Sequence, residues 1–316
     1  MVSESQGEIP NDFKDLGGTG VTLADLAVSS ESLDEDALEN ADYHRHTAVS
    51  KSHLDQIARS PLHYWARYLD PNRVEPTPSD QMALGSALHT HVLELDQWDS
   101  RYVVMPEGLK RTTKEGKATY EALLDDGRTI LSHNTAQQVM AMGRSVLSHP
   151  AAAMLLNLPG QAETTHMWID AGTGLECKCR PDYLTTDGSL VIDVKTTRDA
   201  SPSGFRKSVG QYRYHVQAAW YLYGLEQATG RRPDQFVFVC IESEPPYPCA
   251  VYAADSEMIG IGYDTAMRDL QRLAECKAAN QWPGYSEDVQ IIGLPGWMRP
   301  RPDGTPTGEP PEIELY

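Results

Sequence analysis

One stretch of the chain decides the fold: residues 175–197 have the sequence LECKCRPDYLTTDGSLVIDVKTT. Two β-rich runs flank Thr-Asp-Gly, a sequence typical of a hairpin turn. Because side chains alternate along a strand, Asp193 and Lys195 share one face, and the apolar residues beside them point to the other. The turn brings the chain back so that Asp182 comes close to Asp193. We therefore expect two carboxylates and a lysine at one end of this hairpin.

The flanking sequence predicts a mixed sheet covered by helices. Residues 162–170 predict a further strand, which forms an antiparallel meander with strands at 175–184 and 189–196. A helical region then runs from Ser201-Pro202 to Gly230, and the run QFVFVCIE after it predicts a crossover strand. Other predicted elements are helices beginning near Ser50 and Ser60 and at residues 81–95, 118–125, 132–148 and 255–280, and short strands at 102–105 and 250–253. The expected fold class is α/β.

The two carboxylates suit a hard divalent cation, because Mg²⁺ binds through oxygen ligands. Their mutual repulsion costs free energy unless a cation neutralises it. Lys195 beside them can orient a water and stabilise negative charge on a phosphate, and a metal ion lowers the pKa of that water. A surface Asp/Lys pair on a strand edge is common. Asp182 with Asp193 and Lys195 across one hairpin is therefore a stronger indication than Asp-x-Lys alone.

A histidine on an early helix is a further candidate. His89, in the sequence GSALHTHVLEL, lies at the margin of an apolar stripe, four residues after Gly85, where a small residue permits close approach. His89 is either a half-buried structural histidine or a metal ligand that faces the sheet. His91 lies about 200° around the helix from His89, so the two cannot chelate one ion and zinc is not expected.

A polar stripe follows on the helix of the second half. Gln217 and Tyr221 lie four residues apart on one helical face, and Arg213 lies one turn before them. A glutamine, a phenol and a guanidinium on one stripe can hold a phosphate or position a water. An amphipathic surface helix with aromatic packing is the alternative.

The net charge of −18 is concentrated at the N-terminus. Residues 1–43 carry eleven acids against one lysine and few aromatic residues. We expect a disordered or partly helical segment there, followed by one domain at residues 44–316. This acidity does not exclude a nucleic-acid substrate. A local basic run, whose alternative is a solvated loop, could bind phosphates. It consists of Lys110, Arg111, Lys114 and Lys117.

Cysteine usage and hydropathy indicate the compartment. The five cysteines are scattered without a CxxC pair, which indicates reduced, buried thiols rather than an iron-sulfur cluster. No run of 18 apolar residues and no signal peptide is present, so we expect a cytoplasmic protein without a membrane partner.

These motifs together resemble the nuclease module of the RecB, lambda exonuclease and RecE group of PD-(D/E)xK nucleases. The shared pattern is an early helical histidine, an aspartate after one strand, Asp-x-Lys on the next and Gln-x-x-x-Tyr on the following helix. The closer resemblance is to the RecE (exonuclease VIII) family of phage recombination exonucleases. It spans about residues 45–300 and is carried by GSALHTHVLE, LECKCRPD, VIDVKTT, YRYHVQAAWY and IIGLPGW. It does not extend to the long N-terminal region of full RecE proteins.

The resemblance implies a restriction-endonuclease-like fold and assigns roles to the candidate residues. His89, Asp182 and Asp193 would be ligands of Mg²⁺, for which Mn²⁺ could substitute. Lys195 would be the catalytic lysine, and Gln217 and Tyr221 would be supporting residues of the active site. Glu163 at the start of the first strand is a weaker candidate for a further acidic contributor.

The resemblance also implies an activity and partners. The substrate would be the end of linear double-stranded DNA, digested processively from 5′ ends to mononucleotides. The remaining 3′ single strand would serve recombination through a RecT-like annealing protein. A ring-shaped homo-oligomer, encoded by a phage or prophage and acting in the bacterial cytoplasm, is expected.

A pocket for the 5′-phosphate is expected at Ser50-Lys51-Ser52 with help from Arg45. A helix start offers free N–H groups and partial positive charge to an anion, and serine hydroxyls and basic side chains add donors. The alternative is that a serine merely caps its own helix. Arg180 and Arg213 are further candidates for phosphate binding.

Two rival functions are consistent with the sequence. One is another PD-(D/E)xK nuclease, either Cas4-like or a repair endonuclease, although the cysteine pattern disfavours the Cas4-like form. The other is a catalytically silent DNA-binding or phage assembly module. Paired acids facing phosphates disfavour that module, because a pure binding surface gains nothing from them.

Overall fold

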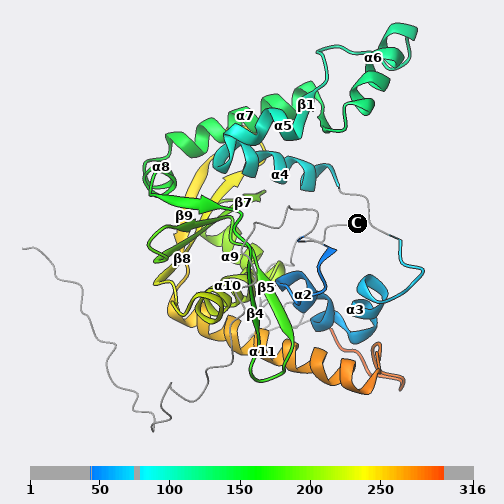
Figure 1. Cartoon of the computed structure of the whole chain (residues 1–316), viewed down its shortest axis with the longest axis vertical. Coiled ribbons are helices and arrows are strands. Elements are labelled where there is room, and N and C mark those ends of the chain that lie inside the picture. Colours follow the sequence, from blue (N-terminus) through cyan, green and yellow to red (C-terminus); the bar gives the residue numbers. More distant parts are fainter. Residues whose placement is uncertain (1–42, 44, 75–78, 295–316) are drawn as a thin grey trace, which may run out of the picture.

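The computed structural model describes residue 43, residues 45–74 and residues 79–294. Within these ranges the chain is a mixed α/β structure, with helices on both faces of a central sheet (Figure 1). The expected fold class is thereby confirmed. Two sequence-based predictions lie outside the described residues, namely the acidic segment before Tyr43 and the last residues of IIGLPGW.

The central sheet has the strand order β3-β6-β7-β8-β9. Its bounds are Gly160–Ala162 for β3, Tyr183–Thr185 for β6, Leu190–Thr197 for β7, Gln235–Glu242 for β8 and Cys249–Ala253 for β9. Strands β7 and β8 are parallel, and the other neighbours are antiparallel. The connection between β7 and β8 runs through α9 (Pro202–Gln211) and α10 (Tyr214–Thr229). The predicted crossover strand is therefore confirmed.

Two helical layers cover the sheet. One layer comprises α4 (Asp80–Leu93), α7 (His133–Ser148) and α8 (Pro150–Leu156), and the other comprises α2 (Lys51–Arg59), α3 (Pro61–Tyr68), α10 and α11 (Ser256–Ala279). Because side chains alternate along β7, as predicted, this strand contacts both helical layers. Val191 packs with the α10 layer, whereas Ile192 and Val194 pack with the α4 layer. Asp193 therefore faces α10.

The predicted three-stranded meander is interrupted. Its first two strands each split in two, so β4 (His166–Ile169) and β5 (Glu176–Cys179) form a separate antiparallel pair. Glu163 ends β3 with a left-handed φ of 54°, and Pro181, which lacks an N–H donor, separates β5 from β6. The N–H of Glu163 still donates to the carbonyl of Asp182 at 3.1 Å. The chain thus bends at the positions of two acidic side chains.

A helical arm leaves the body between two short parallel strands. The chain passes from α4 through η1 (Leu95–Gln97) and α5 (Trp98–Arg101) to β1 (Tyr102–Val104), and returns in β2 (Thr129–Leu131). Between them lies α6 (Lys114–Asp125), capped by the Thr113 side chain, which projects away from α5 and α7 in Figure 1. It begins four residues earlier than the predicted helix at 118–125. No helix in the described ranges combines the length and apolar character needed to cross a bilayer.

Candidate active site

His89 reaches β7 from the α4 layer. Gly85 lies one turn earlier, and a Cβ at that position would be 3.8 Å from the hydroxyl of Thr196, so α4 approaches the strand closely there. His89 Nε2 lies 2.7 Å from the carbonyl oxygen of Val194, which can only accept, so Nε2 donates. The Nδ1 of neutral His89 is then left with its lone pair. The alternative of a purely structural histidine does not account for where Nδ1 points.

Two carboxylates surround that Nδ1 atom. The Oδ2 of Asp182 lies 3.6 Å from it and the Oε1 of Glu163 lies 4.0 Å from it, and the ligand atoms of all three residues lie within 4.8 Å of one another. These distances exceed those of hydrogen bonds and suit ligands arranged around a cation. The Oδ2 of Asp182 is also held at 2.8 Å by the N–H of Val194. One imidazole nitrogen and two carboxylates fit a divalent cation such as Mg²⁺ or Mn²⁺.

The local field favours positive charge. Burial disfavours the charged imidazolium of His89, but the carboxylates of Asp182 and Glu163 raise its pKa to about 9. A proton and a metal ion would compete for the same lone pair. The raised pKa and the ligand geometry therefore have the same cause, which is an excess of negative charge at this point.

Asp193 lies in a second group of side chains, with Lys195 and Gln217. Its carboxylate is fully buried, with Lys195 Nζ 2.6 Å from Oδ2 and the side-chain amide of Gln217 donating to Oδ1 at 2.7 Å. Burial and the neighbouring Asp182 raise the pKa of the Asp193 carboxyl, and Lys195 opposes this rise. Burial lowers the pKa of Lys195, but the negative charges of Asp193 and Asp182 outweigh this effect. The pKa therefore lies above its usual value, and the amine stays charged. The structure thus groups Glu163 with His89 and Asp182, and groups Asp193 with Lys195 and Gln217.

Two tyrosines of α10 lie beside this ion pair. The Tyr214 ring centroid is 5.0 Å from Lys195 Nζ, within the range of a cation–π interaction. Sequence reasoning missed Tyr214, although it lies three residues before Gln217 and therefore on the same helical face. Burial, with Tyr43, Asp193 and Asp182, raises the pKa of Tyr221 well above its usual value. Its phenol stays protonated and remains a hydrogen-bond donor.

The two candidate arginines near the site are engaged within the protein. Arg180 is buried, donates to the Thr165 hydroxyl at 2.6 and 2.9 Å, and stacks 4.4 Å from the Tyr43 ring. Arg213 lies outside the stripe of Gln217 and Tyr221. It precedes α10 with a left-handed φ of 56°, and its guanidinium pairs with Asp269 of α11. Both guanidinium groups thus contact side chains from other parts of the chain.

The expected 5′-phosphate pocket lies at the start of α2. Ser50 is the N-cap residue and is buried, with its hydroxyl 2.7 Å from His53 Nδ1 and 2.9 Å from the Ser52 hydroxyl. Lys51 donates to the carbonyl of Tyr212 at 2.7 Å and pairs with a carboxylate of α2. Burial lowers the pKa of the Lys51 amine. The positive charge of Lys195 also lowers this pKa, but to a smaller extent. Arg45 is exposed.

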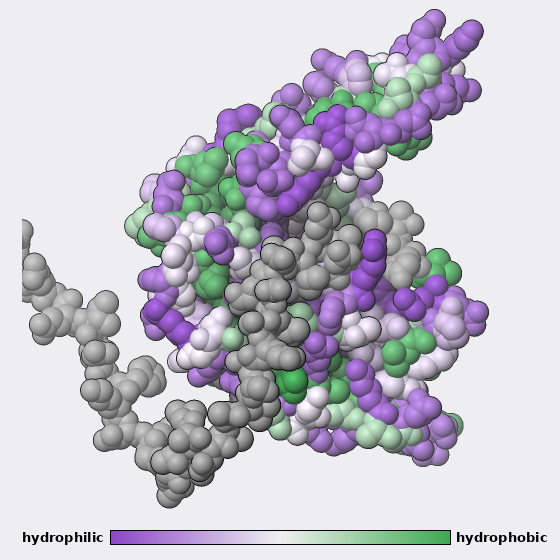
Figure 2. All heavy atoms as spheres, in the orientation of Figure 1, coloured by the Kyte–Doolittle hydropathy of each residue, from purple (hydrophilic) through white to green (hydrophobic). Residues whose placement is uncertain are grey.

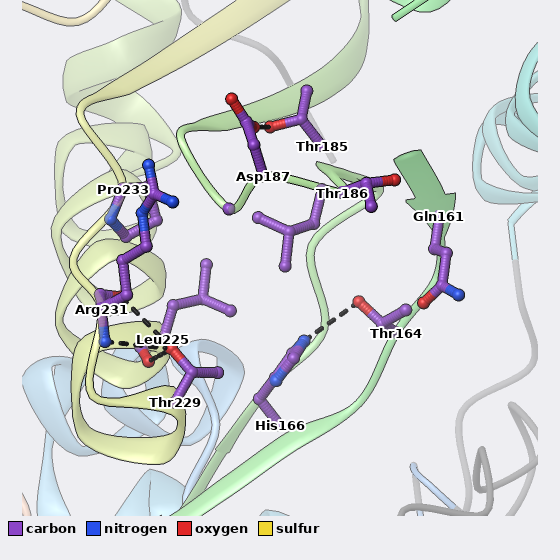
Figure 3. A pocket seen from close by; sticks show the side chains of 12 residues that line it. Gln161, Thr164, His166, Thr185, Thr186, Asp187, Leu225, Thr229, Arg231 and Pro233 are labelled. Carbon is purple, nitrogen blue, oxygen red and sulfur yellow. Dashed lines mark hydrogen bonds between the residues drawn. The ribbon is translucent and has the colours of Figure 1, made fainter. Parts of the chain in front are cut away.

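A hollow of about 410 Å³ with a mixed polar and apolar lining lies apart from these groups, next to the segment that follows Glu163; Figure 3 shows its lining residues. Thr164 and His166 face it from the segment that follows Glu163, and Asp187 and Arg231 line it from the β6–β7 turn and the end of α10. The side chain of Glu163 thus lies near His89, whereas those of Thr164 and His166 line the hollow. None of the residues grouped around His89 or Asp193 lines this hollow.

Solved structures resemble this fold at low sequence identity. A protein from Eubacterium rectale described as "Putative exonuclease" is 13% identical, with a TM-score of 0.55, over 88% of this chain and 96% of that chain. This likeness bears on the fold alone. A phage related exonuclease from Haemophilus somnus 129PT is 9% identical over 62% of this chain and 95% of that chain. Its TM-score of 0.31 is too low to support an argument. No curated protein matches the sequence.

A family model covers most of the chain. Residues 50–295 match a family described as a PDDEXK-like domain of unknown function, DUF3799. The matched range contains every residue grouped around His89 and Asp193. The family and the mixed α/β fold together support a nuclease. The chain therefore belongs to the PDDEXK-like family DUF3799.

Proposed function

We propose that this protein is a Mg²⁺-dependent exodeoxyribonuclease that digests linear double-stranded DNA from the 5′ end, as the RecE family does. The observation that carries the proposal is the juxtaposition of two groups at the middle of β7. His89, Glu163 and Asp182 offer three metal ligands, and Asp193 with Lys195 offers a buried carboxylate and an ammonium. A cation site next to a fixed positive charge suits hydrolysis of a phosphodiester.

Each side chain has a separate task in this mechanism. A bound divalent cation would supply Lewis acidity and lower the pKa of the attacking water. The carbonyl of Val194 fixes the tautomer and orientation of His89, as an outer partner does for a metal-ligating histidine. Lys195 keeps its charge and stabilises the negative charge that develops on the phosphate. Gln217 holds Asp193 in place so that Lys195 has a rigid partner.

The ligand set proposed here replaces one member of the set expected from the sequence. Glu163 takes the place of Asp193 around His89, because the Asp193 oxygens are engaged by Lys195 and Gln217. Asp193 can still act on the metal site through its charge. Mn²⁺ should substitute for Mg²⁺, because both accept oxygen-rich sites with an imidazole.

The direction of digestion and the partners rest on the resemblance to RecE. A RecT-like annealing protein would take up the 3′ tail, and a ring-shaped homo-oligomer would retain the duplex between successive cuts. A phage or prophage origin and action in the bacterial cytoplasm belong to the same proposal. The alternative is an endonuclease with the same metal site, of the Cas4-like or repair type.

The decisive experiment uses linear duplexes that carry a label at the 5′ or the 3′ end, with and without Mg²⁺. Early release of labelled mononucleotide from the 5′ end alone, and only with Mg²⁺, is the expected result. A covalently closed plasmid tested in parallel should stay intact. Cutting of the plasmid would favour the endonuclease, and absence of hydrolysis on every substrate would favour a silent binding module.

The 5′-phosphate pocket has its own test. Duplexes with a 5′-phosphate and a 5′-hydroxyl should be digested at different rates by the wild type. An Arg45→Ala, Lys51→Ala double variant should lose this difference. The same preference in both proteins would place the pocket elsewhere.

A further inference from the structure

The arm formed by residues 105–128 contains a helix, α6, that does not pack an apolar face on the core. Within the part of the chain that the structure describes, α6 buries Gly116 and no apolar side chain, and Leu124 is 56% exposed. A helix in a globular protein normally owes its stability to an apolar face that packs on the core. This helix lacks such a face, so its role lies in what its surface contacts.

The basic residues of the arm are gathered in one compact place. A Cβ on Gly116 would lie 2.0 Å from the carbonyl oxygen of Lys110, so the loop folds tightly over the first turn of α6. The Thr113 hydroxyl fixes this fold, because it donates to Lys110 O at 3.1 Å and accepts from Gly116 N at 3.0 Å. Lys114 and Lys117 lie three residues apart on one face of the helix. Like charges this close repel unless an anion lies between them.

These charges have no acidic partner among the residues that the structure describes. Across residues 43, 45–74 and 79–294, no ion pair involves Lys110, Arg111, Lys114 or Lys117, and all four are exposed. The guanidinium of Arg111 instead lies over the Tyr120 ring, 4.9 Å from its centroid. Glu115 and Glu121 share α6 with the lysines but form no ion pair with them within the described residues, and Asp126 pairs with Arg128 at the base. Figure 2 shows a mainly hydrophilic surface at the tip.

We propose that this arm is a second DNA contact, which binds the phosphate backbone of duplex DNA outside the active site. The partner follows from charge complementarity, because a cluster of exposed basic side chains that form no ion pair with described residues suits a polyanion better than an apolar protein surface. With twelve residues, α6 extends roughly 18 Å, enough to follow several phosphates along a groove. The contact is independent of sequence and of the metal. It adds to the proposed nuclease function without depending on it.

The test measures binding rather than cleavage. Fluorescence anisotropy with a 5′-phosphorylated duplex in EDTA, over a series of salt concentrations, compares the full-length wild type with a Lys110→Ala, Lys114→Ala, Lys117→Ala variant. Each lost phosphate contact should reduce the slope of log K against log salt by about 0.9, and weaken binding by roughly tenfold at 0.1 M salt. The matched control is Glu121→Ala with Asp125→Ala on the same helix. This control should leave the slope unchanged and should not weaken binding.

The outcomes separate the possible partners. An unchanged salt slope in the triple variant would overturn the proposal, whatever the nuclease assay gives. Loss of self-association in that variant, seen by sedimentation with the DNA slope unchanged, would assign the arm to a second copy of the chain instead. A reduced slope in a protein that cuts no DNA would support the arm and overturn the nuclease function. The melting temperature of the variant should match that of the wild type, because the three lysines are exposed.

Discussion

The candidate active site and the α6 arm use charge in opposite ways. In the site, the buried charge of Asp193 has partners within the protein: the carboxylate is fully buried, and Lys195 and Gln217 contact its two oxygens. In the arm, Lys110, Arg111, Lys114 and Lys117 are exposed and form no ion pair with described residues. Buried charges need partners because desolvation is costly, whereas exposed charges are tolerated without them. Contacts within the protein therefore fix the positions of the charged side chains in the site. The basic side chains of the arm are available to contact a ligand.

The largest expected effect concerns the metal ligands. Asp182→Asn keeps an oxygen for the N–H of Val194 but removes a negative charge beside His89. Single-turnover hydrolysis of a linear duplex should fall roughly a thousandfold, because cation binding and water activation are both weakened.

Asp187→Asn is the matched control, since this carboxylate lies in the β6–β7 turn and bonds Thr185 and Ser189. It should cut at nearly the wild-type rate. Unchanged hydrolysis by the Asp182→Asn protein would show that the metal site has been placed on the wrong residues.

The next effect is on the free energy of unfolding. It should be large for the buried Asp193–Lys195 pair and small for the exposed lysines of the arm. Lys195→Met removes the ammonium and leaves the buried Asp193 carboxylate without its ion-pair partner. The free energy of unfolding in urea should fall by about 3 kcal/mol, the lower end for a broken buried pair, because Lys195 is 15% exposed. Adding Asp193→Asn to this variant should restore most of the loss. If the single variant is as stable as the wild type, the pair is more hydrated than its burial indicates.

A smaller effect should follow from Tyr214. Tyr214→Leu removes the ring near Lys195, and the catalytic rate constant should fall about tenfold, as expected for a desolvated cation–π contact of about 1–2 kcal/mol. Tyr214→Phe keeps the ring and should retain nearly full activity, with KM unchanged in both variants. Equal losses in the two variants would point to the hydroxyl group and not to the ring face.

The smallest effect is expected in the arm. Lys114→Ala with Lys117→Ala should change the free energy of unfolding by no more than about 0.5 kcal/mol, because both side chains are exposed. Urea denaturation of the double variant beside the wild type measures this. A loss above 1 kcal/mol would mean that the arm packs on the body and would weaken the contrast with the site.

Sequence reasoning succeeded where structure is set by local pattern. The alternation along β7, the turn before it and the crossover to β8 follow from strand periodicity and turn residues. It could not show contacts between residues that are remote in the chain. The ion pair of Arg213 with Asp269 is one example, because the two residues are 56 positions apart and only the packing of α11 on α10 brings them together. The bend at Glu163 was also missed; there the left-handed φ accompanies a hydrogen bond to Asp182, 19 residues later in the chain.

The hydrogen bond from His89 to Val194 has a consequence for the protein during its own synthesis. The two residues are 105 positions apart, and Gln217 follows Asp193 by another 24. A ribosome that adds 5–20 residues per second needs roughly ten seconds to pass from the first of these groups to the last. Until α10 has emerged, the growing chain has ligands but no assembled site. The groups of the proposed site can thus be complete only after the second half of the domain has been made.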